Sequence, residues 1–227
     1  MTTLRFLTWN INFKDLTPDR VIRIMALISR QNPDIICLQE VPISMVDHFQ
    51  IPEYHRIGVS FQYEYNTIIL SRFPYIRYDR YPLPETSMGR NLLLTNIILQ
   101  SGKIIHVGTF HLESVFNQSP PTSASETLKM NQLRYIRSII PPNTIIMGDT
   151  NLVSNGPLEI EGLYDLTEKS QPTFNNKSRL DRIITNFPPN STPTLTPNSP
   201  PNPKIELIGT RSHSDHCGLI MNLSVSQ

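Results

Sequence analysis

Short apolar runs recur along the whole chain and predict a protein rich in β-strands. Ile, Leu, Val and Thr dominate these runs, and Asn, Pro, Gly or Ser bound them, as is typical of strands. Several runs are apolar without alternation, which predicts strands that are covered on both faces. The eight main runs span residues 5–11, 34–39, 66–71, 91–99, 104–110, 144–149, 179–185 and 217–223.

Two helices are predicted from apolar spacing and from their terminal residues. The first follows Thr17 as a cap and has Pro18 at its first helical position. The second follows the sequence SASE at 123–126, where Ser123 and Glu126 have the spacing of a capping box. Because apolar helix stripes need sheet faces to cover them, we predict an α/β fold. The stripes are Val21, Ile24, Met25 and Ile28 in the first helix, and Met130, Leu133, Ile136 and Ile140 in the second.

No internal repeat or shift in composition divides the chain, so we predict a single domain over residues 1–227. Residues 187–203 contain too many prolines for regular structure. Because this segment lies between two predicted strands, we interpret it as an inserted loop and not as a linker between domains.

The charge of the chain limits how it can contact nucleic acid. Its formal net charge is +1, whereas proteins that coat nucleic acid along the backbone usually carry a basic excess. We therefore expect any such contact to be local, at an end or at a single phosphate.

The cysteines and the N-terminus indicate a compartment. Cys37 and Cys217 both lie in apolar runs, so we interpret them as core residues of a protein in a reducing environment. The first residues lack the pattern of a signal peptide, and no apolar run is long enough to span a membrane. We expect an intracellular protein of the nucleus or cytoplasm, with no membrane partner.

Chemically capable polar residues stand at or near the ends of the predicted strands. Taken singly, each has an ordinary interpretation as a turn residue, a solvated strand edge or an ion-paired strand residue. If the strand ends converge, however, these residues gather carboxylates, amides and two histidines in one cleft. They are Asn10, Glu40, His111, Glu113, Asp149, Asn151, Asp181, Asp215 and His216.

Such a set of side chains fits the hydrolysis of a phosphodiester. Mg²⁺ typically takes one or two carboxylates and keeps several waters. A further carboxylate can orient and deprotonate the attacking water, while imidazolium and amide donors stabilise charge on the phosphoryl oxygens. A nearby carboxylate can keep a histidine protonated near neutral pH. The sequence has no Gly-x-Ser-x-Gly elbow, no zinc-type cysteine cluster and no glycine-rich phosphate loop, which argues against the alternatives.

Six motifs appear in the order TWNI, LQE, HLES, GDTN, RLDRI and SDHCGL between residues 8 and 219. In this order they resemble the endonuclease/exonuclease/phosphatase superfamily over nearly the whole chain. RNLL at 90–93 and MNQL at 130–133 are further similar to its tyrosyl-DNA phosphodiesterase branch. The resemblance implies a four-layered, DNase I-like α/β sandwich, in which helices flank two packed sheets and the active site lies at one sheet edge.

The resemblance also implies an activity and its partners. It implies Mg²⁺-dependent hydrolysis, with Mn²⁺ as a substitute, of the bond between a protein tyrosine and a 5′ phosphate of DNA. Such adducts form when a type II topoisomerase is trapped on DNA, so the implied role is DNA repair by a monomeric enzyme. Some members of the branch also cleave tyrosine-linked RNA, and the sequence alone does not separate these substrates.

The family pattern implies roles for the residues that match it. Glu40 would be the principal direct Mg²⁺ ligand, with Asn10 and Asp215 near the metal or its waters. Asp149 would align and deprotonate the attacking water, and Asn151 would hold both water and phosphate.

Further matches concern the phosphate and the groove. His111 and His216 would bind the non-bridging oxygens, and Asp181 would keep His216 charged and correctly oriented. Ser114 matches a position that contacts phosphate. Three residues match positions that line the substrate groove in the tyrosyl-DNA branch: Arg90, Tyr65 and Phe174.

Departures from the pattern leave the substrate open. Val153 and Phe116 stand where the family often has arginine, and Phe174 stands where tryptophan is expected. Two alternatives therefore remain. One is another enzyme of the superfamily, such as an abasic-site endonuclease, a 3′ exonuclease or a phosphoinositide phosphatase. The other is a non-catalytic module that binds phosphorylated ends.

Overall fold

The computed structural model describes residues 2–14, 16–60, 62, 64–114, 123–186 and 204–225. These residues form two six-stranded mixed sheets. The expected proline-rich loop at 187–203 and the departure at Phe116 lie outside the described residues.

Each sheet combines strands that are distant in sequence. The first sheet has the order β11 (Ile205–Ile208), β12 (Gly218–Val225), β1 (Thr2–Asn10), β2 (Ile35–Pro42), β4 (Tyr65–Ser71) and β3 (His55–Ile57). The second sheet has the order β5 (Tyr75–Pro82), β6 (Asn91–Ile98), β7 (Ile104–His111), β8 (Thr144–Asp149), β10 (Asp181–Thr185) and β9 (Tyr164–Asp165).

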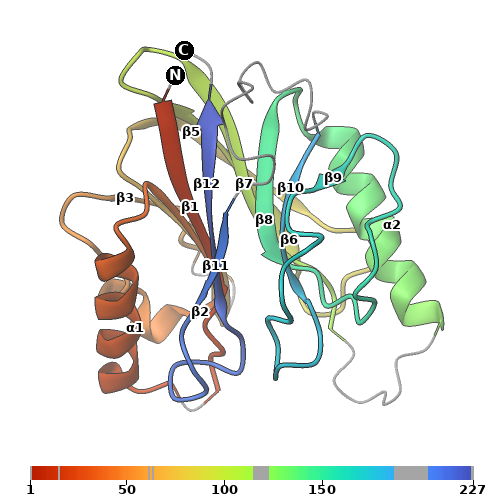
Figure 1. Ribbon diagram of the computed structural model, residues 1–227, viewed down its shortest axis with the longest axis horizontal. Coiled ribbons are helices and arrows are strands. Elements are labelled where there is room, and N and C mark those ends of the chain that lie inside the picture. The colour runs from red at the N-terminus through yellow and green to blue at the C-terminus, as the bar shows by residue number, and fades with distance from the viewer. Residues whose placement is uncertain are drawn as a thin grey trace.

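Helices cover the outer faces of the two sheets, so the molecule has four layers (Figure 1). Helix α1 (Pro18–Gln31) packs on the first sheet, and α2 (Ser123–Ile139) packs on the second. A short 3₁₀ helix, η1 (Ile43–His48), follows β2. The predicted four-layered sandwich is confirmed. No described helix has both the length and the apolar character needed to cross a membrane.

Three apolar clusters hold these layers together. One lies between α1 and the first sheet, one between the sheets, and one between the second sheet and α2. Strand β1 shows the reason, because Leu7 and Trp9 face α1 whereas Leu4 and Phe6 face the second sheet. Both faces of the central strands are covered, as the unbroken apolar runs predicted. Each such buried side chain stabilises the fold by about 1.5–3 kcal/mol.

All eight predicted strands are present, but four others were not predicted. Strands β3, β9 and β11 have only two to four residues each, too few for a recognisable pattern. Strand β5 lies at a sheet edge with all of its residues exposed or half-buried, so its sequence YIRYDRYP is largely polar. The predicted start of α1 is confirmed, since Thr17 Oγ1 accepts a hydrogen bond from the Arg20 backbone nitrogen.

Two parallel strand pairs bring strand ends to one edge of the molecule. Strand β1 pairs in parallel with β2 after the α1 crossover, and β7 pairs in parallel with β8 after α2. Their C-terminal ends therefore point the same way, toward the bottom of Figure 1. His111 pairs with Asp149 in register, and Asp149 pairs with Asp181 across the antiparallel β8–β10 ladder.

Gly148 allows the close approach of β7 and β8 at this edge. A Cβ atom at this position would lie 1.9 Å from the carbonyl oxygen of Phe110, so any larger residue would push the strands apart. The glycine in GDTN therefore serves the register that brings His111 beside Asp149.

Candidate active site

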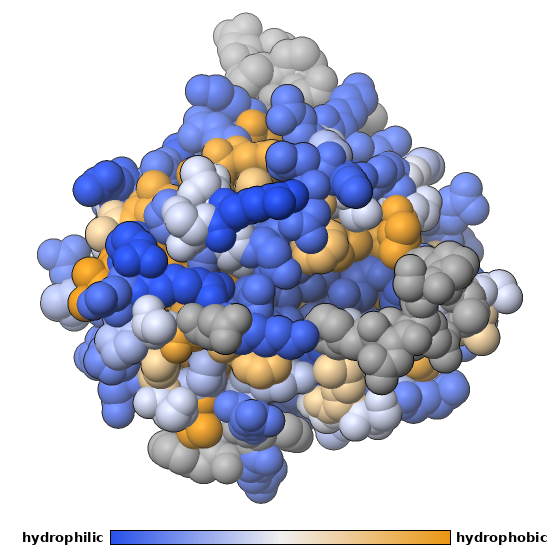
Figure 2. Space-filling model, turned by 90° about the horizontal axis from the view of Figure 1, so that it is seen from below, coloured by the Kyte–Doolittle hydropathy of each residue, from blue (hydrophilic) through white to orange (hydrophobic). Residues whose placement is uncertain are grey.

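A pocket of about 230 Å³ opens where the ends of the two sheets meet. Figure 2 views the molecule from this end and shows a mainly hydrophilic face with a hollow near its middle. Residues that the sequence singled out line the pocket: Asn10, Glu40, His111, Ser114, Asp149, Asn151, Phe174, Asp215 and His216. The structure thus brings residues from the first strand and the last strand to one place.

Asp149 lies at the centre of this arrangement and is fixed on both oxygens. Its Oδ2 accepts a hydrogen bond from Asn10 Nδ2 at 2.9 Å, and its Oδ1 accepts one from the Asn151 backbone nitrogen at 2.8 Å. The Nε2 atoms of His111 and His216 lie 3.5 and 3.7 Å from Oδ2. Burial raises the pKa of Asp149, although the charge of His216 partly opposes that rise. The carboxylate is therefore suited to accept a proton.

Glu40 is aimed into the pocket by an irregular segment of β2. Its φ angle is 60°, in the left-handed region that non-glycine residues rarely adopt, and the strand register shifts around it. Its two carboxylate oxygens accept hydrogen bonds from Asn10 Nδ2 and from the Phe13 backbone nitrogen. Asn12 and Asn151, which also line the pocket, have positive φ angles as well. Such strain is typical of functional sites.

His216 and Asp181 form a buried ion pair beside the pocket. The histidine Nδ1 lies 2.8 Å from Asp181 Oδ2, and both side chains are buried. Burial by itself would lower the pKa of His216, but the carboxylates of Asp181 and Asp149 raise it above its ordinary value. His216 is therefore a cation whose Nε2–H is directed toward the pocket. This agrees with the expectation that a nearby carboxylate keeps a histidine protonated.

Two groups of side chains are candidates for binding a metal. Within the described part of the chain, Asp149, Asp181 and His216 offer ligand atoms that all lie within 4.8 Å of one another. Against the effect of burial, the carboxylates of Asp181 and Asp149 raise the pKa of His216, which disfavours the neutral ring that a metal needs as a ligand. Glu40 and Asp215 line the same pocket and offer the hard oxygen atoms that Mg²⁺ prefers. These two carboxylates fit a divalent cation better than the histidine group does.

His111 differs from His216 in charge. Its Nδ1 lies 2.6 Å from Arg90 Nη1, and a guanidinium group can only donate, so this nitrogen accepts and Nε2 carries the proton. Burial lowers the pKa of His111 well below its ordinary value, and the charges of Arg90 and His216 lower it further. The expectation that a nearby carboxylate keeps a histidine protonated therefore applies to His216. It does not apply to His111, which is a neutral donor.

The other groove positions divide between two pockets. Tyr65 and Arg90 line a smaller pocket of about 20 Å³ next to Glu40 and His111. The Arg90 guanidinium lies 5.5 Å from the centre of the Tyr65 ring, and Phe13 stacks on the same ring at 4.7 Å. Val153, one of the departures from the family pattern, lines the main pocket.

Trp9 and Ser214 hold the SDH segment in place; they lie in the TWNI and SDHCGL motifs, but no role was predicted for them from the sequence. The Trp9 indole donates to the His216 carbonyl oxygen at 3.0 Å. Ser214 Oγ donates to the Asn10 carbonyl and accepts from the His216 backbone nitrogen. The terminal strands β1 and β12 are thereby joined at the pocket, a contact between residues about 200 positions apart.

Lys129 of α2 also lines the pocket and was missed. Its side chain is 4% exposed, and its Nζ lies 2.7 Å from both the Asn151 carbonyl oxygen and Glu126. A signal was present in the sequence, because Ser125, Lys129 and Gln132 form a polar row at helical spacing. All three are buried beside Leu133 and Ile136, whereas Met130 of the predicted stripe is only partly buried.

The chain is similar in sequence to proteins of a known family. The model of the Endonuclease/Exonuclease/phosphatase family matches residues 7–216. Tyrosyl-DNA phosphodiesterase 2 of Xenopus laevis is 32% identical over 167 residues, which are 70% of this chain and 43% of that protein. The Rattus norvegicus protein of the same name is 29% identical over 175 residues, 72% of this chain and 46% of that protein. The chain therefore spans less than half the length of these relatives.

Solved structures show the same fold. A D. rerio TDP2 structure complexed with single-strand DNA product has a TM-score of 0.75 and 23% identity, and covers 98% of this chain and 99% of that chain. An endonuclease/exonuclease/phosphatase from Bacteroides vulgatus also has a TM-score of 0.75, with 18% identity and full coverage of both chains. With its family match, its four layers and its strand-end pocket, the chain belongs to the endonuclease/exonuclease/phosphatase family.

Proposed function

We propose that this chain is a Mg²⁺-dependent phosphodiesterase that cleaves the bond between a protein tyrosine and a 5′ phosphate of DNA, in DNA repair. One observation carries the chemistry. The Asp149 carboxylate is held by two asparagines, faces a neutral and a charged histidine, and shares the pocket with Glu40. The named relatives support the choice of substrate.

The proposed metal site consists of Glu40 and Asp215, with Asn10 beside them. The fit rests on the donor set, because the buried Glu40 carboxylate and the half-buried Asp215 carboxylate offer oxygen atoms that suit Mg²⁺, and Mn²⁺ accepts the same ligands. A cation held there would neutralise charge on the phosphate during attack. Asn10 donates hydrogen bonds to both Glu40 and Asp149, so it fixes the position of the proposed metal ligand relative to the proposed base.

Asp149 serves as the proposed general base. Its carboxylate lines the pocket where the proposed attacking water binds, and its raised pKa makes proton acceptance easier than for an exposed aspartate. Asn151 donates its backbone N–H to Asp149 and its side-chain amide to the Leu112 carbonyl, so it fixes the base to the end of β7.

The two histidines have different proposed tasks at the phosphoryl group. His216, charged by Asp181, donates from Nε2 to an oxygen that gains negative charge as the bond to phosphorus forms. His111 donates from its neutral Nε2 without adding charge. In this proposal the phosphoryl group therefore receives hydrogen bonds from one cationic and one neutral imidazole.

The substrate proposal rests on the groove as well as on the relatives. Ser114, Phe174, Tyr65 and Arg90 lie in or beside the pocket, where the family pattern puts phosphate and groove contacts. A trapped type II topoisomerase on DNA is the proposed biological adduct, and tyrosine-linked RNA is a second candidate of the same bond type. We propose a monomer that acts in the nucleus or cytoplasm.

A panel of substrates tests this function directly. We expect release of a 5′-phosphorylated product from a 5′-phosphotyrosyl oligonucleotide in the presence of Mg²⁺, and none with excess chelator. Abasic-site DNA, a 3′-phosphorylated duplex and a phosphoinositide serve as the competing substrates. Faster turnover of any competitor than of the tyrosyl oligonucleotide, or undiminished turnover with chelator, would refute the proposal.

A further inference from the structure

Glu113 is a buried carboxylate that the proposed mechanism does not use. Only 4% of the residue is exposed, although it follows His111 by two positions in the HLES motif. Its Oε1 accepts hydrogen bonds from the backbone nitrogen and the hydroxyl of Ser87, and its Oε2 accepts one from Thr86 Oγ1 at 2.8 Å. All three donors belong to the loop of residues 83–90 that joins β5 to β6.

The Thr86 hydroxyl connects Glu113 to Arg90. It donates its proton to the Glu113 carboxylate and accepts a hydrogen bond from the Arg90 backbone nitrogen at 2.8 Å. A hydroxyl can do both at once, because it has one proton and two lone pairs. Arg90 in turn donates from Nη1 to His111 Nδ1. An unbroken chain of hydrogen bonds therefore runs from Glu113 through the loop to the back of His111.

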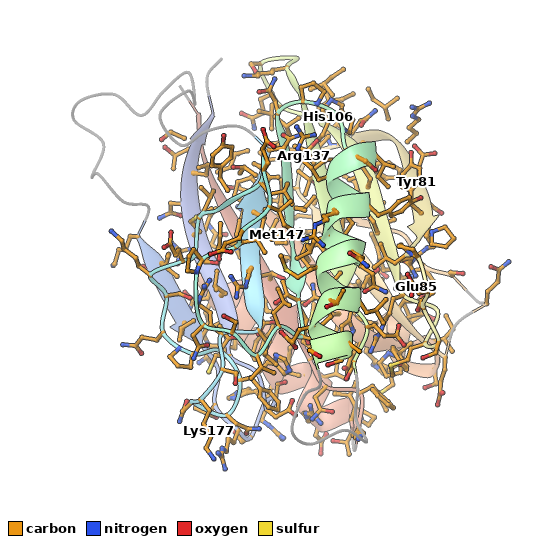
Figure 3. All side chains as sticks on the ribbon, turned by 90° about the vertical axis from the view of Figure 1, so that its right-hand side faces the viewer. Tyr81, Glu85, His106, Arg137, Met147 and Lys177 are labelled. Carbon is orange, nitrogen blue, oxygen red and sulfur yellow. The ribbon has the colours of Figure 1, made fainter. Side chains whose placement is uncertain are left out.

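Helix α2 holds the same loop from its other end. Gln132 Nε2 donates to the Pro84 carbonyl oxygen, and Gln132 Oε1 accepts from the Glu113 backbone nitrogen, both at 3.0 Å. Gln132 is fully buried, so this contact is part of the packed structure and not a surface contact. Figure 3 shows Glu85 of this loop beside α2. The loop is thereby fixed between the helix and the end of β7.

The geometry points to Glu113 as a positioning residue for His111. By holding the loop of residues 83–90, it keeps Arg90 against His111 Nδ1, and this contact keeps the histidine proton on Nε2, which faces Asp149. Without the carboxylate, three donors of the loop lose their acceptor. The proton of His111 can then move between the two ring nitrogens. The kinetic consequence rests on the proposed function, whereas the tautomer of His111 does not.

Four substitutions separate this role from general damage to the fold. Glu113→Gln keeps the size but replaces one acceptor oxygen with an NH2 group, which cannot accept a hydrogen bond from Ser87 or Thr86. Thr86→Val removes the connecting hydroxyl without a change in shape, and Thr86→Ser restores it. Glu85→Gln makes the same chemical change as Glu113→Gln at an exposed position of the same loop. Thermal unfolding shows whether each variant is folded.

The decisive measurements are the ring ¹⁵N signals of His111 and the kinetics on the 5′-phosphotyrosyl oligonucleotide. We expect the parent, Thr86→Ser and Glu85→Gln to show His111 protonated on Nε2 alone, with similar kcat. Glu113→Gln and Thr86→Val should show a mixture of tautomers, and kcat should fall roughly 10- to 100-fold with a smaller change in KM.

Unchanged His111 signals in both folded variants would overturn the inference. A mixture of tautomers together with an unchanged kcat would overturn its kinetic part. If the parent does not turn over the tyrosyl substrate at all, the proposed function fails, and the ¹⁵N signals alone then decide the role of Glu113.

Discussion

Asp149 shows how single residues acquire chemistry from their surroundings. Its carboxylate is buried, which favours the protonated form, yet it accepts hydrogen bonds from Asn10 and from the Asn151 backbone and lies near the charge of His216. Together these influences raise the pKa of Asp149 to about 6, which suits a carboxylate that accepts a proton near neutral pH. His111 and His216 make the same point, because two histidines less than 4 Å from one carboxylate differ in charge.

We predict that Asp149→Asn abolishes turnover and leaves the fold intact. The amide has a similar size and can still accept from Asn10, but it cannot accept the proton of the attacking water. The measurement is kcat on the 5′-phosphotyrosyl oligonucleotide, with thermal unfolding as a check on the fold. Asp47→Asn, at a well exposed position, is the matched control and should retain activity. Activity of Asp149→Asn within tenfold of the parent would reject the role.

We predict that His216→Ala reduces transition-state stabilisation by about 2–4 kcal/mol, as expected for the loss of one donor to a developing oxyanion. The measurement is kcat/KM at saturating Mg²⁺. His55→Ala, which removes an exposed imidazole from β3, is the control. A loss as small for His216→Ala as for the control would mean that the charged imidazole does not contact the phosphate.

At the scale of elements, helix α2 does more than cover the second sheet. Its buried face carries Ser125, Lys129 and Gln132 as well as apolar residues, and the two longer side chains reach loops that border the pocket. Lys129 supports the Asn151 carbonyl, and Asn151 has a φ angle of 50°. The ammonium group thus stabilises the strained turn whose backbone N–H holds Asp149.

We predict that Lys129→Met lowers both stability and activity. The apolar stem is retained, but the Asn151 carbonyl loses a charged donor, which costs about 1–3 kcal/mol in the free energy of unfolding. Because the GDTN turn then loosens, kcat should fall while substrate binding changes less. Urea unfolding and steady-state kinetics measure the two effects. Lys169→Met, at an exposed position, should change neither, and equal behaviour of the two variants would contradict the prediction.

At the scale of the whole molecule, a buried charge cluster closes the edge of the second sheet. Asp165 of β9 lies 2.6 Å from Arg179 and 2.7 Å from Arg182, and all three side chains are at most 3% exposed. The two guanidinium groups also donate to carbonyl oxygens of residues 154–156, in the loop that follows the GDTN motif. Stability at this edge and the shape of the pocket therefore depend on the same three residues.

We predict that this cluster makes stability depend on pH in the acidic range. Burial alone raises the pKa of Asp165, but Arg182 and Arg179 lower it more, so its pKa in the folded state lies below the ordinary value. Its contribution is complete above the unfolded-state pKa of about 4 and is lost as the pH falls through the folded-state pKa.

The difference in unfolding free energy between the parent and Asp165→Asn isolates this contribution from other carboxylates. We expect about 3–5 kcal/mol at pH 7, because the substitution leaves two buried cations without a counterion. The difference should shrink as the pH is lowered below about 4. A difference that stays constant from pH 7 to pH 3 in urea unfolding would contradict the assignment.

Much of the architecture could be predicted from local patterns. The eight long strands, both helices and the cap at Thr17 follow from apolar spacing and terminal residues, which act over a few positions. The short strands β3, β9 and β11 could not be predicted, because pairing with a long neighbour, and not their own composition, makes them strands. Strand β5 was missed for a related reason, since an edge strand keeps a polar face.

The sequence by itself determined which residues reach the strand ends, because strand length and the order of the motifs are local properties. The resemblance of the ordered motifs to a known family then predicted that Asp149, His216, Glu40 and Asn10 share one cleft. Only the tertiary structure decided the charges of the two histidines and the duties of Glu113 and Lys129. Those properties depend on which donors and acceptors meet across the sheets, between segments that are 20 to 200 residues apart in the chain.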